Sequence, residues 1–240
     1  MRLTLAIVLL ELAVAALLLW GAGSFLYRAS ISLGLVRAAK PFELGGTNYA
    51  KTLLVLGDST GVGVGAARPE ETVAGLLGKG IGATYVENHA VSGAVSKDLK
   101  KQMAQTKLGR YDAILLQIGA NDIIAWRSAP DTAATLAPLL EELSKRGGRV
   151  YWMSAGNVGG ATIFPFFLRP FYTALNLKYH SAFAALAQEK GITYVNLYTP
   201  PAKDPFAKHP EIYLAKDGLH PSSAGYALFY QRLKESAGIQ

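Results

Sequence analysis

The sequence predicts one α/β domain around a five-stranded parallel sheet, preceded by a single apolar helix. Short apolar runs alternate with longer helical patterns after Lys51, which is typical of a parallel sheet with crossover helices. The chain has 240 residues, of which 50% are hydrophobic, enough for one sizeable core. The apolar run from Leu3 to Trp20, broken only by Thr4 and Glu11, stands before this pattern.

After residue 51 the predicted elements follow one another in a regular order. Strand 52–56 is a continuous apolar run that ends at Gly57, which is typical of a strand buried on both faces. Helix 69–77 opens with Pro69 and two glutamates, as a helix N-terminus prefers. The others are strand 84–87, polar helix 97–106, buried strand 112–118, amphipathic helix 131–145, strand 149–153, helix 172–190, strand 193–197 and helix 221–236, whose apolar side carries Tyr226, Leu228, Phe229 and Leu233.

The N-terminal run favours a retained membrane anchor over a cleaved signal peptide. As a helix it is about 27 Å long, close to the thickness of a bilayer's hydrocarbon. A signal peptide has a shorter apolar region and a small-x-small cleavage site, which Gly21-Ala22-Gly23 matches poorly. The core helix of a soluble protein is a further alternative. We therefore assign residues 1–28 to a transmembrane anchor or uncleaved signal, 29–50 to a membrane-proximal linker and 51–240 to the folded domain.

Charge and cysteine content exclude several classes of function. The net charge is +7, but residues 1–40 hold +3 of it (four cations, one anion), leaving +4 for the remaining residues. Because no dense stripe of Lys and Arg follows, we expect no nucleic-acid partner; an acidic membrane surface is favoured. The absence of cysteine excludes disulfides and thiolate chemistry. Cations lie on both sides of the apolar run, so the positive-inside rule does not favour export.

Two loops of the predicted sheet carry the groups that nucleophilic catalysis needs. Ser59 lies in GDSTG directly after the first strand, at the edge where parallel sheets bind ligands, although these letters also make an ordinary turn. Asp217 stands three residues before His220 in DGLHP, so one short loop can carry a base and the carboxylate that orients it. A plain Asp-Gly turn before a proline-started helix is the alternative.

No other histidine shows such a pattern. His89, His180 and His209 lack a carboxylate at this spacing, so we interpret them as structural or exposed. The sequence has no HExxH motif and no cluster of metal-ligand residues, so we expect no metal and no cofactor.

Two further loops offer donors for the oxyanion of a tetrahedral intermediate. NHAVSG ends at Gly93 after the second strand, and GAND contains Asn121 after the third. Gly93 can bring a backbone N–H close because it has no Cβ, and Asn121 can offer its amide, although each is also a common turn residue. In a three-layer, flavodoxin-like sandwich with strand order 2-1-3-4-5, the loops that carry Gly93, Ser59 and Asn121 converge. We therefore expect this fold.

The four blocks together resemble the SGNH or GDSL-type hydrolase superfamily, in particular its bacterial lysophospholipase- and thioesterase-like esterases. GDST, NHAVSG, GAND and DGLHP occur in the family's order, and the resemblance covers residues 51–235. Thr60 stands where the family often has Leu, a mild departure. The resemblance implies a hydrolase domain over 51–240, with Ser59 as nucleophile, His220 as base, Asp217 as its orienter, and the N–H groups of Ser59 and Gly93 with the Asn121 amide as oxyanion hole.

Three other interpretations fit single motifs but not the set. GDSTG also satisfies the G-x-S-x-G elbow of α/β-hydrolases, but that fold has strands before the elbow. The glycines at 61, 63 and 65, with Glu87 after them, imitate a dinucleotide-binding fingerprint but leave GAND and DGLHP unexplained. A membrane-tethered binding module on an inactive hydrolase scaffold is disfavoured because all the catalytic groups are present.

An aromatic segment bears on the substrate. Residues 164–172 hold five aromatic side chains, either in a loop that covers the core or in an apolar lip that contacts an acyl chain or lipid: Phe164, Phe166, Phe167, Phe171 and Tyr172. With the anchor, such a lip favours lipid-like substrates. We predict a membrane-anchored serine esterase that hydrolyses acyl (thio)esters such as lysophospholipids. Deacylation or O-acyl transfer on cell-envelope glycans is the alternative. For this type of protein we expect a single pass through a bacterial inner membrane and a periplasmic catalytic domain.

Overall fold

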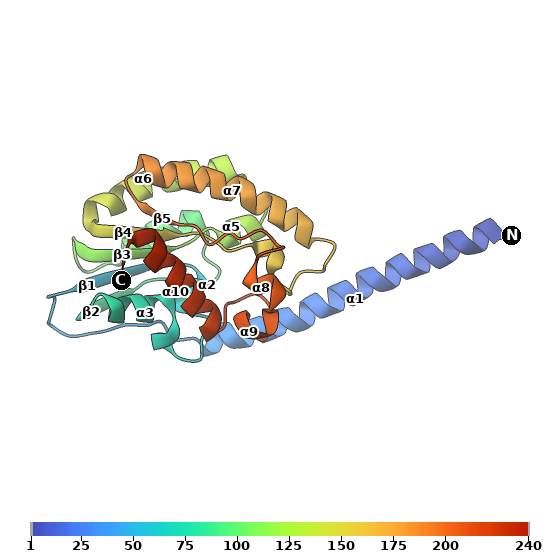
Figure 1. The fold of residues 1–240 in the computed structure, drawn as a ribbon, viewed down its shortest axis with the longest axis horizontal. Coiled ribbons are helices and arrows are strands. Elements are labelled where there is room, and N and C mark those ends of the chain that lie inside the picture. Colours follow the sequence, from blue (N-terminus) through green and yellow to red (C-terminus); the bar gives the residue numbers. More distant parts are fainter. Residues whose placement is uncertain (1, 240) are drawn as a thin grey trace.

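The computed structural model describes residues 2–239 and contains a five-stranded parallel sheet between two layers of helices (Figure 1). The strands lie in the order β2-β1-β3-β4-β5, and each neighbouring pair is parallel. This confirms the predicted fold class and strand order. The strands are β1 (Thr52–Gly57), β2 (Tyr85–Asn88), β3 (Tyr111–Gln117), β4 (Gly147–Met153) and β5 (Thr193–Val195).

Helices cover both faces of the sheet. One layer contains α3 (Val73–Gly80) and α10 (Ser223–Ala237); the other contains α4 (Leu99–Met103), α6 (Ala129–Arg146) and α7 (Arg169–Glu189). Shorter elements that the sequence did not predict occupy the connections: α2 (Ser59–Val62), α5 (Ala120–Ile124), α8 (Pro205–Lys208), α9 (Pro210–Tyr213) and the 3₁₀ turn η3 (Val158–Gly160). Two further 3₁₀ turns lie at the starts of the predicted helices 69–77 and 97–106: η1 (Pro69–Glu71) and η2 (Ser96–Asp98).

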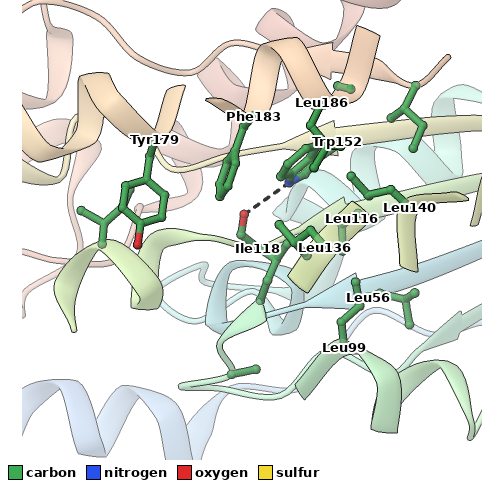
Figure 2. Close-up of a cluster of buried hydrophobic side chains, with 14 of the residues drawn as sticks. Leu56, Leu99, Leu116, Ile118, Leu136, Leu140, Trp152, Tyr179, Phe183 and Leu186 are labelled. Atoms are coloured by element: carbon green, nitrogen blue, oxygen red, sulfur yellow. Dashed lines mark hydrogen bonds between the residues drawn. The ribbon is translucent and has the colours of Figure 1, made fainter. Parts of the chain in front are cut away.

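The core explains why β1 is apolar throughout. Its alternate side chains pack on opposite helix layers, Leu54 and Leu56 in one cluster and Leu53 and Val55 in the other. In the first cluster the Trp152 ring packs against Phe183, and its indole N–H donates to the Ile118 carbonyl at 3.4 Å (Figure 2). Burying a leucine side chain contributes roughly 1.5–3 kcal/mol, so a polar residue within β1 is strongly destabilising. The strand therefore holds its carboxyl end rigidly.

The N-terminal helix α1 (Arg2–Ala38) is continuous and far longer than a bilayer requires. Its most apolar 18-residue window has a mean hydropathy of 2.4, which is enough to cross a membrane by length and composition. The helix runs past residue 28, where we expected the anchor to end, so residues 29–38 of the predicted membrane-proximal linker are helical. Contact with the folded body explains this extension, because one side of the helix from Gly21 onward is partly covered.

Candidate active site

Ser59 follows β1 on a tight turn that opens the short helix α2. Asp58 caps this helix, accepting hydrogen bonds from the Thr60 N–H at 2.9 Å and the Thr60 hydroxyl at 2.7 Å. Gly57 has a φ of 140°, and a Cβ there would clash with the Gln117 carbonyl of β3. Only glycine fits this position. The strand end and the cap together fix the backbone at Ser59.

The last loop of the chain brings His220 and Asp217 to this serine. The hydroxyl of Ser59 donates to Nε2 of His220 at 2.9 Å, although 161 positions separate the two residues. Nδ1 of His220 donates to Oδ2 of Asp217 at 2.6 Å. All three residues are buried, with Asp217 fully enclosed. The structure thus brings together the three residues that the sequence analysis singled out.

The surroundings of Asp217 determine which ring nitrogen carries the proton. Burial opposes ionisation of this carboxyl, but the hydrogen bond and charge of His220, with the backbone N–H groups of Leu219 and His220, hold its pKa below the usual range. An ionised carboxylate only accepts hydrogen bonds, so Nδ1 of His220 carries the proton. Nε2 then remains free to accept the Ser59 hydroxyl proton.

The loop that carries Gly93 is attached to the end of β1. The Val91 N–H donates to the Gly57 carbonyl at 3.0 Å, and the Asn88 amide donates to the Gly61 carbonyl at 2.9 Å. Gly93 has a φ of 81°, a left-handed conformation that favours glycine, and an added Cβ would meet open space. The left-handed backbone conformation, rather than a lack of space for a side chain, therefore explains why position 93 is a glycine.

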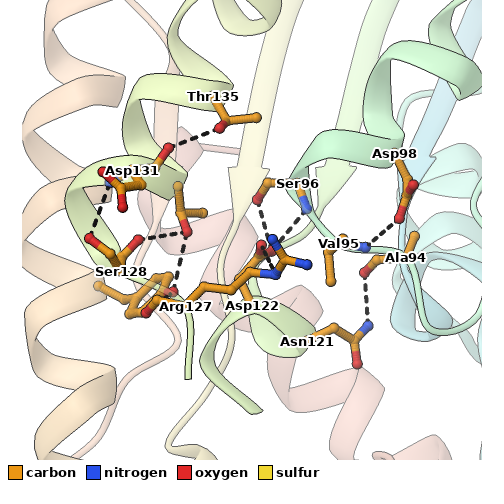
Figure 3. Close-up of polar contacts among 12 residues, drawn as sticks. Ala94, Val95, Ser96, Asp98, Asn121, Asp122, Arg127, Ser128, Asp131 and Thr135 are labelled. Carbon is orange, nitrogen blue, oxygen red and sulfur yellow. Dashed lines mark hydrogen bonds and ion pairs between the residues drawn. The ribbon is translucent and has the colours of Figure 1, made fainter. Parts of the chain in front are cut away.

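Residues of the GAND block hold the same loop from the other side (Figure 3). The Asn121 amide donates to the Ala94 carbonyl at 2.9 Å, which leaves its second N–H hydrogen available. Asp122 accepts from the N–H and hydroxyl of Ser96, at 2.9 and 2.8 Å, and lies 3.7 Å from Arg127. Burial raises the pKa of Asp122. The loops with Gly93 and Asn121 thus contact each other, and the first of them also contacts the end of β1.

An apolar cavity of about 90 Å³ lies beside the nucleophile. The residues on either side of Ser59 and of His220 in the sequence line this cavity: Asp58, Thr60, Leu219 and Pro221. Side chains from farther along the sheet complete it, including Ile118, Ile124, Met153, Val158, Leu197, Phe206 and Phe229. Such a space suits an apolar group joined to the reacting carbonyl.

The predicted aromatic lip divides into two parts. Phe164 and Tyr172 are buried and pack against each other with tilted rings, 4.3 Å between ring centroids, so they belong to the core rather than to a lip. Phe166, Phe167 and Phe171 are exposed, by 55%, 39% and 48%. Among the described residues that line the cavity beside Ser59, none belongs to 164–172.

The remaining histidines lie outside this constellation. His89 pairs with Glu87 at 2.9 Å and His180 contacts the Tyr194 hydroxyl at 2.9 Å, whereas His209 is exposed. Within residues 2–239, no three carboxylate or imidazole groups are gathered in a way that would hold a metal ion.

Sequence reasoning missed two residues that support the nucleophile. Gln102 is buried, and its amide both donates to the Gly57 carbonyl and accepts from the Gly57 N–H, each at 2.8 Å. A glutamine within a polar helix gives no signal of this role. Asp58 is also buried, and desolvation raises its pKa to about 6. It was visible in the sequence only as part of the GDST block.

A hydroxyl, an imidazole and a carboxylate joined at the carboxyl edge of a doubly wound sheet define the class of serine hydrolases. Comparison with known families narrows this further. The model of the GDSL-like lipase/acylhydrolase family matches residues 55–228, and the chain belongs to that family.

The relatives agree with this assignment. A GDSL-like esterase of Mycobacterium tuberculosis is 30% identical over 186 residues, which are 73% of this chain and 58% of that protein. The chain thus spans little more than half of that relative's length. Two solved structures share the fold. A lipolytic G-D-S-L family protein from Veillonella parvula has a TM-score of 0.61 and 18% identity, and the match covers 77% of this chain and 97% of that protein. The acetylxylan esterase Axe2 from Geobacillus stearothermophilus has a TM-score of 0.59 and 21% identity, and the match covers 80% of this chain and 96% of that protein.

Proposed function

We propose that this protein is a membrane-anchored serine esterase that hydrolyses acyl (thio)esters by way of an acyl-enzyme. The observation that carries the proposal is the hydrogen-bonded chain from Ser59 through His220 to Asp217. Membership in a family of lipases and acylhydrolases supports it.

The geometry supports a two-step mechanism. His220 Nε2 takes the Ser59 proton as the oxygen attacks the acyl carbon, and the same proton then passes to the leaving alcohol or thiol. Asp217 stabilises the imidazolium that forms between these events. The N–H groups of Ser59 and Gly93 and the free amide hydrogen of Asn121 are proposed to stabilise the oxyanion. Water, activated by His220, then attacks the acyl-enzyme and releases the acid.

Two features support a lipid-like substrate such as a lysophospholipid. The cavity beside Ser59 has a mostly apolar lining, which suits the alkyl part of an acyl group. The apolar helix α1 would place this cavity near lipid. We propose a bacterial inner membrane as the location, with the catalytic part in the periplasm.

A deacylase or O-acyltransferase acting on cell-envelope glycans is the second candidate. The modest size of the cavity favours it, since an acetyl group would fit without a long groove. The acetylxylan esterase that shares the fold acts on a sugar ester, by its name. A sugar ester is therefore the alternative to a lipid-like ester as the substrate of this chain.

A panel of p-nitrophenyl esters distinguishes the two candidates. We expect full-length protein to prefer octanoyl or palmitoyl over acetyl ester, and Ser59→Ala to abolish turnover of all three. Ser181→Ala, which changes an exposed serine on α7, serves as the matched control and should leave turnover unchanged. A clear preference for acetyl would favour the glycan deacylase, and turnover by Ser59→Ala would exclude Ser59 as the nucleophile.

A further inference from the structure

The solvent exposure of α1 changes abruptly at Gly21. Residues 4–20 are exposed along every side, whereas Gly21 is buried, and partly covered positions then recur at helical spacing: 24, 28, 29, 31, 32, 35 and 36. An added Cβ on Gly21 would lie 3.5–3.6 Å from Pro165 and Phe167. The bare segment of about 25 Å approaches the thickness of bilayer hydrocarbon, so for the membrane anchor proposed above the boundary of the membrane falls at Gly21.

The segment of α1 after this boundary packs on the active-site edge of the sheet. Arg28 donates to the Thr162 hydroxyl at 3.1 Å, and a Cβ on Gly218 would clash with the Arg28 guanidinium. Gly218 belongs to the loop that carries Asp217 and His220. Since 28 − 21 = 7 residues rise about 10 Å along a helix, this loop lies roughly that far from the boundary. In Figure 1 the bare part of α1 extends away from the same end of the body.

Exposed aromatic side chains gather at this end. Phe167 packs beside Gly21, and Phe166 lies next to it at 5.6 Å between ring centroids. Phe171 pairs with Trp126 at 4.8 Å, and Trp126 is 57% exposed. Trp126 has a φ of 55°, and within the described chain it is the single residue other than glycine with a positive φ. Such backbone is energetically costly for a residue other than glycine.

A surface groove lies between these rings and the turn η3. Phe166, Pro170 and Leu177 line a surface groove of about 580 Å³, whose inner wall includes Gly159 and Gly160. These glycines belong to η3, and Val158 of the same turn lines the cavity beside Ser59. One short turn therefore separates the groove from the cavity.

We propose that the body docks on the bilayer through Trp126, Phe166, Phe167 and Phe171, so that the crevice at Ser59 takes acyl esters directly from the leaflet. This proposal assumes the ester hydrolysis proposed above and adds the source of its substrate. Aromatic side chains favour the headgroup level of a bilayer, where acyl ester bonds also lie. The occupant is lipid rather than a second copy of the chain, because the patch is continuous with the helix that enters the membrane.

Quenching by brominated lipids tests the docking without using activity. The chain has three tryptophans, so Trp20→Phe leaves Trp126 and the buried Trp152 as emitters. Full-length Trp20→Phe protein is placed in vesicles of phosphatidylcholine and phosphatidylglycerol with bromines near the glycerol or deep in the tails. We expect stronger quenching by the shallow bromines, and loss of that quenching when Trp126→Phe is added. Emission that no bromolipid affects would overturn the proposal.

A comparison of two substrates tests the consequence for catalysis. Phe166→Ser with Phe171→Ser should lower turnover of a bilayer-embedded acyl ester on the order of tenfold while turnover of water-soluble p-nitrophenyl acetate stays unchanged. Tyr49→Ser removes a comparably exposed ring before β1, at the other edge of the sheet, and should change neither. Equal losses on both substrates would contradict docking. If Ser59→Ala kept its turnover, the esterase proposal would fail, whereas the quenching result would stand independently.

Discussion

Asn121 has two amide hydrogens and uses one of them on the Ala94 carbonyl. If the other stabilises the oxyanion, Asn121→Ala should lower kcat on the order of 10²-fold while KM changes little, because the interaction forms mainly in the transition state. Steady-state kinetics with a soluble ester measures both constants. Asn48→Ala, which changes an exposed asparagine before the amino end of β1, should leave kcat unaltered. A loss under twofold for Asn121→Ala would contradict its role.

Asp58 links stability to pH. Burial raises its pKa from 3.8 to about 6, so between these values the folded chain holds a proton that the unfolded chain has released. Its contribution to stability is therefore present below pH 4 and lost as pH rises through 6. Asp58→Asn removes this dependence and keeps an oxygen that can cap α2.

Urea unfolding of both proteins in detergent micelles measures this effect. Relative to Asp58→Asn, the free energy of unfolding of the wild type should fall by about 3 kcal/mol as pH rises from below 4 to above 6. This value follows because the pKa of Asp58 differs by about two units between the folded and unfolded chains, and each unit corresponds to about 1.4 kcal/mol. A difference that stays constant over this range would show that Asp58 titrates normally.

At the scale of elements, α4 stabilises the end of β1 through Gln102. Gln102→Leu would leave the Gly57 N–H buried without an acceptor, at a cost of about 1–3 kcal/mol, and would loosen the turn before Ser59. We expect a lower unfolding temperature and a lower kcat. Gln105→Leu, at an exposed position nearby, should change neither. Unaltered kcat in Gln102→Leu would show that the turn does not depend on α4.

The same scale shows what the sequence could predict. Strand β1 could be predicted because its apolar run is short, continuous and ends at Gly57, which favours a strand buried on both faces over a helix. The short helices α2, α5, α8 and α9 were missed because four or five residues give no periodicity, and caps and tertiary contacts decide their conformation. In the aromatic segment, composition alone could not tell that Phe164 faces the core and Phe166 the solvent.

The candidate site was easier to predict than the elements around it. Ser59, His220, Asp217, Gly93 and Asn121 all occur in short blocks, and the strand order then determines which blocks meet. Supporting residues such as Gln102 carry no such signal, because their role depends on contacts made across the fold.

At the scale of the whole molecule, we propose that the long helix α1 anchors the protein in a membrane. If α1 spans the bilayer, alkaline carbonate should leave full-length protein in the membrane pellet, because carbonate releases peripheral proteins but not inserted helices. Immunoblotting of both fractions measures this. Complete release into the supernatant would contradict the anchor and would favour a cleaved signal or a peripheral attachment.

Labelling with a fluorophosphonate tests most directly whether distant parts of the chain form one catalytic centre. Peptide mass spectrometry should locate the adduct on Ser59 in the wild type, and His220→Ala should lose the labelling because no base then activates the hydroxyl. An adduct on another serine, or equal labelling of Ser59 in both proteins, would contradict the account.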